Sequence, residues 1–477
     1  MWEIVQEKLD TYKDSWFYDG KTRISYCEVK KYAERVGQNL RDMLRIKSKC
    51  AVLCDSEMMT ALGILSCWYA QLIPVPMSMN YGEKHCMSII ETSNLKYLIT
   101  DKESYSEKFG LYTYNIENSV WYGERVGQAE EHELDDIDII MNTSGTTGKP
   151  KGVMITNSGL YQNIINISHY FKIKENDTIL IARPLYHCAV LTGEFLISLY
   201  NGLNICFYIG TYNPMAIIHY MNCWNISVMC GTPTLFLQIS NYFARQKQYA
   251  QLRVIALSGE VLTSQIAEKI RSVFKQTEIY NVYGLTEASP RVSYLDPALF
   301  DKYAESVGIP LVNTKITIRD NEGNEVIAGV DGNIFVESTC LMRGYYRNKR
   351  LSEEKLTKYG LKTGDIGYVD KDGRLYIRSR ADDMIIKAGM NIYPSEIENS
   401  ICNFPFILET VAYGKRDDMG QKIAVNIVLK DGYKEMTKRD IMSAFSESLP
   451  THLMPSWLEI VDKLPRNGSG KIIRPRE

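Results

Sequence analysis

The amino-acid sequence predicts an α/β protein with a large N-terminal region and a small α+β domain at the C-terminus. Short apolar runs such as Val254–Leu257 alternate with helix-length amphipathic segments such as 263–275, which is typical of largely parallel sheets covered by helices. After about residue 305, turn sequences become dense between short strands, and this indicates antiparallel hairpins or a small barrel. From about residue 383, helix and strand patterns alternate again, over a length sufficient for a small domain.

The first part of the chain supports this fold class in order. Strands are predicted at Cys50–Cys54 and Tyr97–Thr100, and amphipathic helices at 28–45 and 158–171. The most apolar stretch, 58–76, contains a glutamine and a proline and falls short of the roughly 18 uninterrupted apolar residues that a membrane-spanning helix needs. It therefore predicts a buried helix at about 58–71 followed by a short strand, and no membrane span.

Composition excludes several classes of protein. The chain has 477 residues, with 55 Lys and Arg against 57 Asp and Glu, for a formal net charge of −2. Such a balance argues against a protein whose main task is binding nucleic acid or an anionic membrane. The eleven cysteines are scattered without a CxxC pair, and the N-terminus lacks a signal-peptide pattern. We therefore expect reduced thiols and a cytoplasmic location.

The most informative segment is a loop rich in glycine, hydroxyl groups and lysine. An apolar strand beginning near Asp138 runs directly into it. Glycines let backbone N–H groups converge on an anion, while hydroxyls and lysines add donors and positive charge, so the loop predicts a polyphosphate site. It is not a Walker A loop, because Thr143 and Pro150 occupy two of the positions that define that pattern. The candidate phosphate-binding residues are Thr143, Ser144, Gly145, Thr146, Thr147, Gly148, Lys149 and Lys151.

The loop at 143–152 resembles the signature loop of the adenylate-forming (ANL) superfamily, which includes acyl- and aryl-CoA synthetases, nonribosomal-peptide adenylation domains and luciferases. Further segments resemble that superfamily's motifs in the same order along the chain. They are Tyr-Gly-Leu-Thr-Glu at 283–287, Thr-Gly-Asp at 363–365, the long segment 379–398 and the terminal loop 464–474. The resemblance therefore covers essentially the whole chain. Within the segment 379–398 it has one departure, Ser379 in place of the usual glycine.

The resemblance implies roles for several of these residues. Tyr283 would stack on adenine, Thr286 would hold the α-phosphate, and Glu287 would bind Mg²⁺ that bridges the phosphates. Asp365 would accept hydrogen bonds from the ribose hydroxyls, and Arg380 would help to hold the nucleotide. Further candidates for ATP or AMP binding are Ser258, Gly259, Glu260, Asn281 and Gly284. The candidate catalytic residues are Lys471, Thr286, Glu287 and His187.

The resemblance also implies two domains that move relative to each other. Residues 1–381 would form the adenylation domain, with two doubly wound α/β sheets and a small distorted β-barrel. Residues 382–477 would form a mobile cap that swings about a hinge at Asp382. In one orientation the cap would supply the catalytic Lys471, and in the other it would supply a tunnel for the thiol arm. The candidate tunnel residues are Lys387, Gly389 and Tyr393.

The segment 183–195 bears on the choice of acid. It resembles the Pro-Leu-aromatic-His form of acyl-CoA synthetases, with His187 where enzymes for α-amino acids carry an aspartate. The sequence therefore predicts an uncharged aliphatic or aromatic acid, with His187 as a gate to the acyl pocket. The candidate pocket residues are His187, Gly193, Cys230, Gly231, Leu257 and Ser258. In contrast, Ser-Gly-Glu at 258–260 looks closer to peptide-synthetase adenylation domains, so the two indicators conflict.

The leading hypothesis is an AMP-forming acyl-CoA synthetase that uses ATP, Mg²⁺ and coenzyme A. It would convert a carboxylic acid to acyl-AMP with release of pyrophosphate and then transfer the acyl group to the thiol of coenzyme A. One alternative is a stand-alone adenylation enzyme that loads the phosphopantetheine of a separate carrier protein. A third interpretation is a nucleotide-binding protein without catalytic activity. The sequence predicts neither the particular acid nor the oligomeric state.

Overall fold

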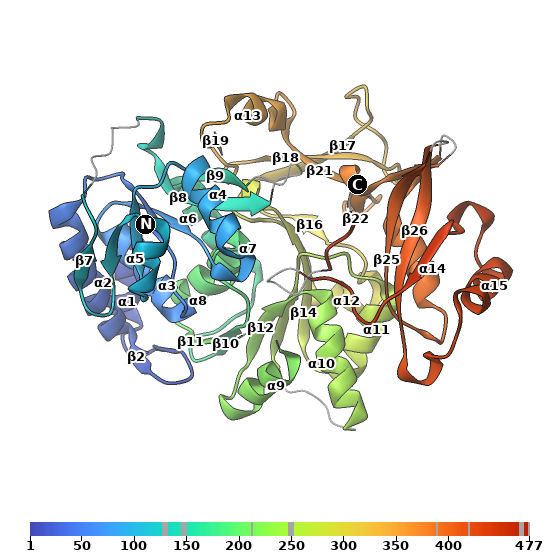
Figure 1. The fold of residues 1–477 in the computed structure, drawn as a ribbon, viewed down its shortest axis with the longest axis horizontal. Helices are drawn as coiled ribbons and strands as arrows, with labels where there is room; N and C mark the ends of the chain where they lie inside the picture. Colours follow the sequence, from blue (N-terminus) through green and yellow to red (C-terminus); the bar gives the residue numbers. More distant parts are fainter. Residues whose placement is uncertain are drawn as a thin grey trace.

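The computed structural model describes residues 1–125, 132–144, 150–210, 213–246, 252–387, 390–417, 420–466 and 472–475. Figure 1 shows the N-terminal elements, in blue, at the left and the C-terminal elements, in orange and red, at the right, with the chain end marked C nearer the middle. The architecture between them confirms the predicted α/β class, with a large N-terminal region and a smaller C-terminal domain. No helix among the described residues combines the length and the apolar character needed to cross a membrane.

The first sheet is built from short, fully buried strands. Across the sheet they are β4 (Ile73–Pro76), β3 (Lys49–Val52), β5 (Tyr97–Thr100), β6 (Tyr112–Asn115) and the antiparallel β7 (Val120–Tyr122). The helices of this part are α1 (Trp2–Thr11), α2 (Tyr26–Met43), α3 (Glu57–Tyr69), α4 (Glu83–Thr92) and α5 (Ser104–Phe109). The predicted buried helix is α3, whose first turn is capped by Ser56, because the Ser56 hydroxyl accepts a hydrogen bond from the Met59 N–H (3.4 Å).

A second, larger sheet runs through the middle of the molecule (Figure 1). In order its strands are β16 (Ile309–Pro310), β15 (Arg291–Leu295), β14 (Glu278–Gly284), β13 (Val254–Leu257), β12 (Val228–Gly231), β10 (Thr178–Ile181), β11 (Asn204–Phe207), β1 (Trp16–Tyr18) and β2 (Arg23–Ser25). The strands from β14 to β1 are parallel, and such pairs need crossover connections. The helices that follow these strands or precede them are α6 (Asn157–Tyr170), α8 (Ile197–Tyr200), α9 (Pro214–Cys223), α10 (Pro233–Arg245), α11 (Ser264–Val273) and α12 (Phe300–Tyr303).

Successive residues of the larger sheet pack into different hydrophobic clusters. Ala256 belongs to the cluster that contains Leu160 of α6, whereas Leu257 belongs to the cluster that contains Phe236 of α10 and Ile270 of α11. This alternation follows from the two-residue period of a strand. Helices therefore cover both faces of the sheet, as a doubly wound fold requires.

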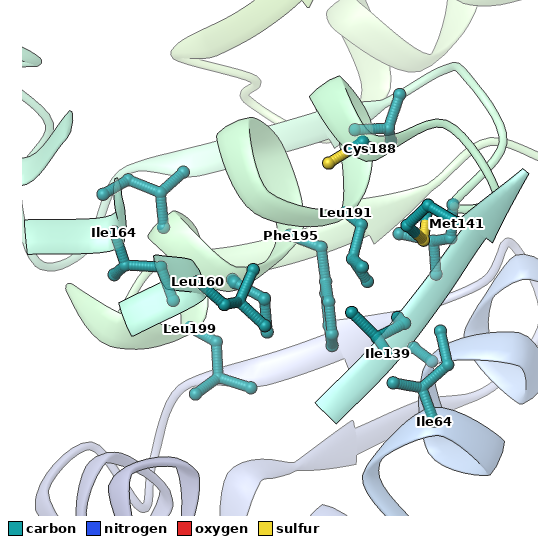
Figure 2. Close-up of a cluster of buried hydrophobic side chains, with 14 of the residues drawn as sticks. Ile64, Ile139, Met141, Leu160, Ile164, Cys188, Leu191, Phe195 and Leu199 are labelled. Atoms are coloured by element: carbon teal, nitrogen blue, oxygen red, sulfur yellow. The ribbon is translucent and has the colours of Figure 1, made fainter. Parts of the chain in front are cut away.

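The two strands that flank the predicted phosphate loop pair with each other as a hairpin. The hairpin strands are β8 (Ile137–Ser144) and β9 (Pro150–Thr156), and β9 also pairs with β19 (Gly344–Tyr345). Next to it lie the short helix α7 (Cys188–Val190) and the π-helical turn η3 (Leu191–Leu196). Figure 2 shows that Ile139 and Met141 of β8 share one core with Leu191 and Phe195 of η3. The hairpin and the segment after His187 are thus held together by a common apolar core.

The strands between residues 314 and 380, apart from β19, form an antiparallel sheet, as predicted. They are β17 (Thr314–Arg319), β18 (Gly332–Ser338), β20 (Leu356–Thr357), β21 (Gly360–Val369) and β22 (Leu375–Arg380), with the helix α13 (Lys349–Lys355) before β20. Short 3-10 turns lie at Met79–Tyr81, His132–Leu134, Thr286–Ala288, Pro297–Leu299, Ala381–Asp383, Asp431–Tyr433 and Thr451–Leu453.

The C-terminal part has its own hydrophobic core. Its elements are β23 (Ile385–Lys387), β24 (Met390–Ile392), α14 (Pro394–Cys402), β25 (Ile407–Asp417), β26 (Gly420–Leu429), α15 (Lys438–Ser448) and β27 (Trp457–Ile460). Ile397 of α14, Ile423 of β26 and Phe445 of α15 are fully buried in that core. A hydrogen bond from Gln265 of α11 to Asn403 (2.9 Å) joins this part to the rest of the molecule. The predicted division at residue 382 stays a prediction.

Candidate active site

The carboxylate of Asp365 gathers two other predicted nucleotide-binding residues. Asp365 lies on β21 directly opposite Arg380, the last residue of β22, and Arg380 Nη1 is 3.2 Å from Asp365 Oδ1. The hydroxyl of Tyr283, near the end of β14, donates a hydrogen bond to Asp365 Oδ2. The side chain of Asp365 is 8% exposed, whereas that of Arg380 is 44% exposed. The buried Asp365 carboxylate therefore holds two side chains, Tyr283 from the larger sheet and Arg380 from the antiparallel sheet, and Arg380 remains accessible.

The electrostatics of this cluster keep Tyr283 a hydrogen-bond donor. Burial and the nearby Asp365 carboxylate raise the pKa of Tyr283 well above its ordinary value. Burial lowers the pKa of Arg380, but Asp365, Tyr283 and Glu287 outweigh that effect, so the pKa of Arg380 is raised. Glu287 is thus close enough to Arg380 to act on its charge. A carboxylate has about four acceptor positions, so Asp365 can still accept from a ribose diol.

Glu287 is tied to the phosphate-loop hairpin through Tyr345. The Tyr345 hydroxyl donates a 2.7 Å hydrogen bond to Glu287 Oε1. Tyr345 belongs to β19, where it lies opposite Val153 of the hairpin strand β9. The Lys151 ammonium group lies 5.9 Å from the centre of the Tyr345 ring. The tyrosine therefore stands between the predicted metal-binding carboxylate and the predicted phosphate-binding lysine, and the second oxygen of Glu287 remains able to bind a hard cation.

The described part of the predicted phosphate loop is its two strand ends. Thr143 on β8 lies opposite Lys151 on β9, and Ser144 lies opposite Pro150. Candidate residues that fall outside the described residues are Gly145, Thr146, Thr147, Gly148, Lys149, Gly389 and Lys471. Thr286 begins the 3-10 turn that also carries Glu287. Gly284 precedes that turn at a position where a Cβ atom would lie 2.1 Å from the Pro290 carbonyl oxygen, so only glycine fits there.

The acyl side of the site begins at His187, which caps α7. Burial and the Arg183 charge lower the pKa of His187 to about 3, so the imidazole is neutral at physiological pH. Burial raises the pKa of the adjacent Cys188 thiol to about 12, and the Glu287 carboxylate adds to that effect. The segment that carries His187 therefore lies close to Glu287. Glu57, at the start of α3, fixes the same segment because its Oε2 accepts a hydrogen bond from the Leu185 N–H (2.9 Å).

Three charged side chains are buried beside the predicted acyl-pocket residues. Arg183 and Glu194 form an ion pair, with Arg183 Nη2 at 2.5 Å and Nε at 3.1 Å from Glu194 Oε1. Ser258 Oγ lies 3.4 Å from Arg183 Nη1. A Cβ atom on Gly193 would lie 2.7 Å from Arg291 Nη2. Buried charged groups therefore lie beside the predicted pocket residues, and two of them, Arg183 and Glu194, belong to the segment 183–195.

Other candidate residues have mainly structural partners. Glu260 Oε2 accepts hydrogen bonds from the Thr234 N–H (3.1 Å) and hydroxyl (2.7 Å), in the first turn of α10. Asn281 donates to the carbonyl groups of Ala304 (2.9 Å) and Ser306 (3.0 Å). Leu257 packs on the α10 face of the sheet, away from the cluster that contains Cys230. Two further candidates lie beside these positions: Gly231 at the end of β12 and Gly259, with φ +90°, after β13.

The C-terminal candidates lie around the junction at Asp382. Asp382 is the middle residue of the 3-10 turn between β22 and β23. Lys387 donates to the carbonyl groups of His452 (3.1 Å) and Met454 (3.3 Å), and burial together with Lys422 lowers its pKa. Tyr393 is buried at the start of α14. The contacts described for Lys387 therefore keep it within the C-terminal part.

The described residues on either side of 467–471 are anchored on the C-terminal part. Arg466 Nη2 lies 2.6 Å from Glu409 Oε1, and Arg474 Nη1 lies 2.6 Å from Glu398 Oε1. The Ile473 N–H donates to the Pro465 carbonyl (2.8 Å). Two arginines thus fix these flanking residues.

The residues that sequence reasoning missed are Tyr345, Glu57, Arg183, Glu194 and Arg291. No sequence pattern indicates the role of Tyr345, because its hydrogen bond to Glu287 joins residues 58 positions apart. The ion pair of Arg183 and Glu194 has a weak sequence indication, since these two charged residues interrupt an otherwise apolar segment.

This fold and this site define a nucleotide-binding α/β enzyme with a separate C-terminal domain. Residues 5–346 match the AMP-binding enzyme family, and residues 396–471 match the AMP-binding enzyme C-terminal domain. The chain belongs to the AMP-binding enzyme family. The predicted resemblance to adenylate-forming enzymes is thereby confirmed.

Two relatives match the chain over nearly its whole length. The protein is 26% identical over 480 residues to the feruloyl-CoA synthase of an Amycolatopsis species, covering 99% of this chain and 97% of that one. It is 28% identical over 457 residues to the 2-succinylbenzoate–CoA ligase of Bacillus cytotoxicus, covering 95% and 92%.

Solved structures share the fold. The o-succinylbenzoate CoA synthetase MenE from Bacillus subtilis, in complex with the acyl-adenylate OSB-AMP, superposes with a TM-score of 0.85 at 23% identity, covering 99% of this chain and 96% of that one. ATP-bound MatB from Rhodopseudomonas palustris gives a TM-score of 0.85 at 20% identity, covering 99% and 97%.

Proposed function

We propose that this protein activates a carboxylic acid with ATP and then transfers the acyl group to the thiol of coenzyme A. The observation that carries the proposal is the convergence of Asp365, Arg380 and Glu287, with Tyr345 joining Glu287 to the phosphate-loop hairpin. The arrangement offers a diol acceptor, a cation and a metal-binding carboxylate where the end of β14 meets the antiparallel sheet. The names of the relatives, a feruloyl-CoA synthase and a 2-succinylbenzoate–CoA ligase, support this reaction class.

In the first step, an oxygen of the acid's carboxylate attacks the α-phosphorus of ATP. A new P–O bond forms, the bond to the β-phosphate breaks, and its electron pair leaves with pyrophosphate. Because an anion approaches an anion, fixed positive charge dominates the catalysis. Lys151 would neutralise the β- and γ-phosphates, and Arg380 would hold the nucleotide beside Asp365. Glu287 would hold Mg²⁺, which would supply further positive charge to the phosphates.

The nucleoside would be held by the cluster around Asp365. With its hydroxyl tied to Asp365, Tyr283 presents a ring of fixed orientation against which adenine can stack. Asp365 keeps free acceptor positions for the ribose hydroxyls. Thr286 lies next to Glu287 at the start of the same turn, a position suited to the α-phosphate.

In the second step, the sulfur of the thiol attacks the carbonyl carbon of acyl-AMP. The C–O bond to AMP breaks, AMP leaves with the electron pair, and the thiol proton is released. We assign the change between the two steps to a swing of residues 382–477 about Asp382, with residues 1–381 as the fixed part. This movement would withdraw Lys471 and bring Lys387, Gly389 and Tyr393 to the thiol arm.

Incubation with ATP, Mg²⁺ and a panel of carboxylic acids, with coenzyme A or with a carrier protein bearing phosphopantetheine, tests the proposal. We expect acid-dependent pyrophosphate release and an acyl thioester on coenzyme A. Glu287→Gln should abolish both signals, and the exposed Glu447→Gln should preserve them. A thioester on the carrier protein alone would favour the alternative acceptor. Absence of acid-dependent pyrophosphate exchange with every acid would indicate a nucleotide-binding protein without this activity.

A further inference from the structure

The buried charges beside the predicted acyl pocket do not balance. Arg183, Glu194 and Arg291 are 6%, 0% and 5% exposed, so two guanidinium groups accompany one carboxylate. Arg183 contacts Glu194 Oε1 through two nitrogens, and the Arg291 charge also acts on Glu194, so a single carboxylate faces both guanidinium groups. Among the described residues, neither Glu194 Oε2 nor Arg291 Nε has a hydrogen-bond partner. An uncompensated buried charge is costly, which makes Arg291 the group that needs an anion.

The neighbours of Arg291 do not supply that anion. Burial raises the pKa of Tyr170 to about 12, so the phenol beside Arg291 is neutral. Glu287 is the nearest acid along the chain, but its Oε1 already accepts the Tyr345 hydrogen bond, and the proposed function assigns its free oxygen to Mg²⁺. The positive charge of Arg291 therefore remains within the pocket region.

Arg291 is held in place and reaches the predicted pocket. Asn163 of α6 fixes its backbone on both sides, because Asn163 Oδ1 accepts from the Arg291 N–H (3.1 Å) and Nδ2 donates to the Arg291 carbonyl (2.9 Å). The guanidinium lies against Gly193, where any side chain would collide with it. The Arg291 charge also acts on the pKa of Cys230, which burial raises. Two small residues of the predicted pocket, Gly193 and Cys230, therefore border this positive group.

We propose that Arg291 pairs with a second anionic group of the acid, so that the preferred substrates are dicarboxylic acids in which one carboxylate reacts and the other binds Arg291. A guanidinium matches a carboxylate with two parallel hydrogen bonds, which gives both charge and direction. The inference rests on the proposed function, because it concerns the acid that is activated at that same site. It replaces the expectation of an uncharged acid.

The test compares acids matched in length and shape that differ in the second carboxylate, such as glutarate with pentanoate and phthalate with benzoate. Thioester formation on coenzyme A is measured for the wild type and for Arg291→Gln. We expect the wild type to favour the dicarboxylic member of a pair by about 100-fold or more in kcat/KM. In Arg291→Gln this ratio should fall, because kcat/KM should drop for the dicarboxylic acid and stay nearly unchanged for the monocarboxylic acid.

Arg319→Gln is the matched control, since Arg319 is a largely buried arginine, paired with Glu325 in the antiparallel sheet, far from these residues in the chain. It should leave the ratio unchanged. A wild-type preference for monocarboxylic acids, or an equal loss for both acids in Arg291→Gln, would overturn the inference and make Arg291 a structural residue. If Arg291→Gln does not fold, the wild-type ratio decides alone. Failure of every acid in both sets counts against the proposed function itself, and the inference falls with it.

Discussion

The hydroxyl of Tyr345 donates a 2.7 Å hydrogen bond to the carboxylate of Glu287, from a strand that pairs with the phosphate-loop hairpin. This bond joins two motifs that lie far apart in the chain. Burial and the Glu287 carboxylate raise the pKa of Tyr345, so the phenol remains a donor at any working pH. The hydrogen bond therefore fixes one oxygen of Glu287 and directs the other.

Tyr345→Phe should weaken the response to Mg²⁺. Hydrogen bonds to charged groups contribute about 1.5–3 kcal/mol, so the Mg²⁺ concentration for half-maximal pyrophosphate exchange should rise about 10-fold or more. The control is Tyr359→Phe, because Tyr359 packs against Phe335 in the antiparallel sheet, outside the proposed site. An unchanged Mg²⁺ dependence in Tyr345→Phe would show that Glu287 is positioned by other contacts.

Asp365→Asn should reduce the affinity for ATP without changing the KM for the acid. The substitution removes the charge that pairs with Arg380 and the proposed acceptor for the ribose diol, so we expect a loss of about 10-fold or more by calorimetric titration with ATP. Asp370→Asn is a matched control on the same hairpin, since Asp370 pairs with Arg374 (2.9 Å). Equal losses in the two variants would point to destabilisation of the hairpin rather than to a nucleotide contact.

Glu57 should make the protein less stable as the pH rises. Burial raises its pKa from 4.5 to about 7, so between these values the folded state keeps a proton that the unfolded chain has released. The free energy of unfolding should therefore fall from pH 4.5 to pH 7, by up to about 3 kcal/mol. Urea denaturation of Glu57→Gln should show this slope removed, whereas the exposed Glu447→Gln should retain it. Identical slopes in wild type and Glu57→Gln would contradict the assignment.

His187, in contrast to Glu57, should make the protein less stable as the pH falls. Its pKa falls from 6.5 to about 3 on folding, so the unfolded chain binds a proton that the folded state excludes. The stability that depends on neutral His187 is complete above pH 6.5 and should be lost as the pH falls, by about 2 kcal/mol at pH 5. His187→Gln should therefore resist acid better than the wild type in pH-dependent denaturation, and the exposed His219→Gln should not. Greater acid sensitivity in His187→Gln would contradict the assignment.

Local patterns predicted the fold because they are set by neighbouring residues. The apolar run after Ser56 predicted α3, and the short apolar run Val254–Leu257 predicted β13 within the larger sheet. That Leu257 and Cys230 lie on opposite faces follows only from the register, in which Leu257 lies opposite Gly231.

Long-range contacts were not predictable in the same way. Glu194 meets Arg183 because a π-helical turn redirects the chain, and no sequence signal marks that turn. Arg291 reaches Gly193 across nearly 100 positions, and its strand β15 pairs antiparallel with β14 in the larger sheet. Such partners are fixed by topology, whereas the motif residues around Glu287 were found from the resemblance.

Lys471 provides the sharpest test of the proposed division of labour between the two steps. Because Arg466 and Arg474, the described residues on either side, are anchored through ion pairs of 2.6 Å, a substitution at position 471 should leave the C-terminal part folded. Lys471→Ala should lose acid-dependent pyrophosphate exchange by about 100-fold or more, since it removes a cation that stabilises the first transition state. The same variant should still transfer the acyl group from supplied acyl-AMP to coenzyme A, and Lys463→Ala should retain both activities. Parallel loss of both half-reactions in Lys471→Ala would show that this lysine, and therefore the cap orientation that carries it, serves the thiol step as well.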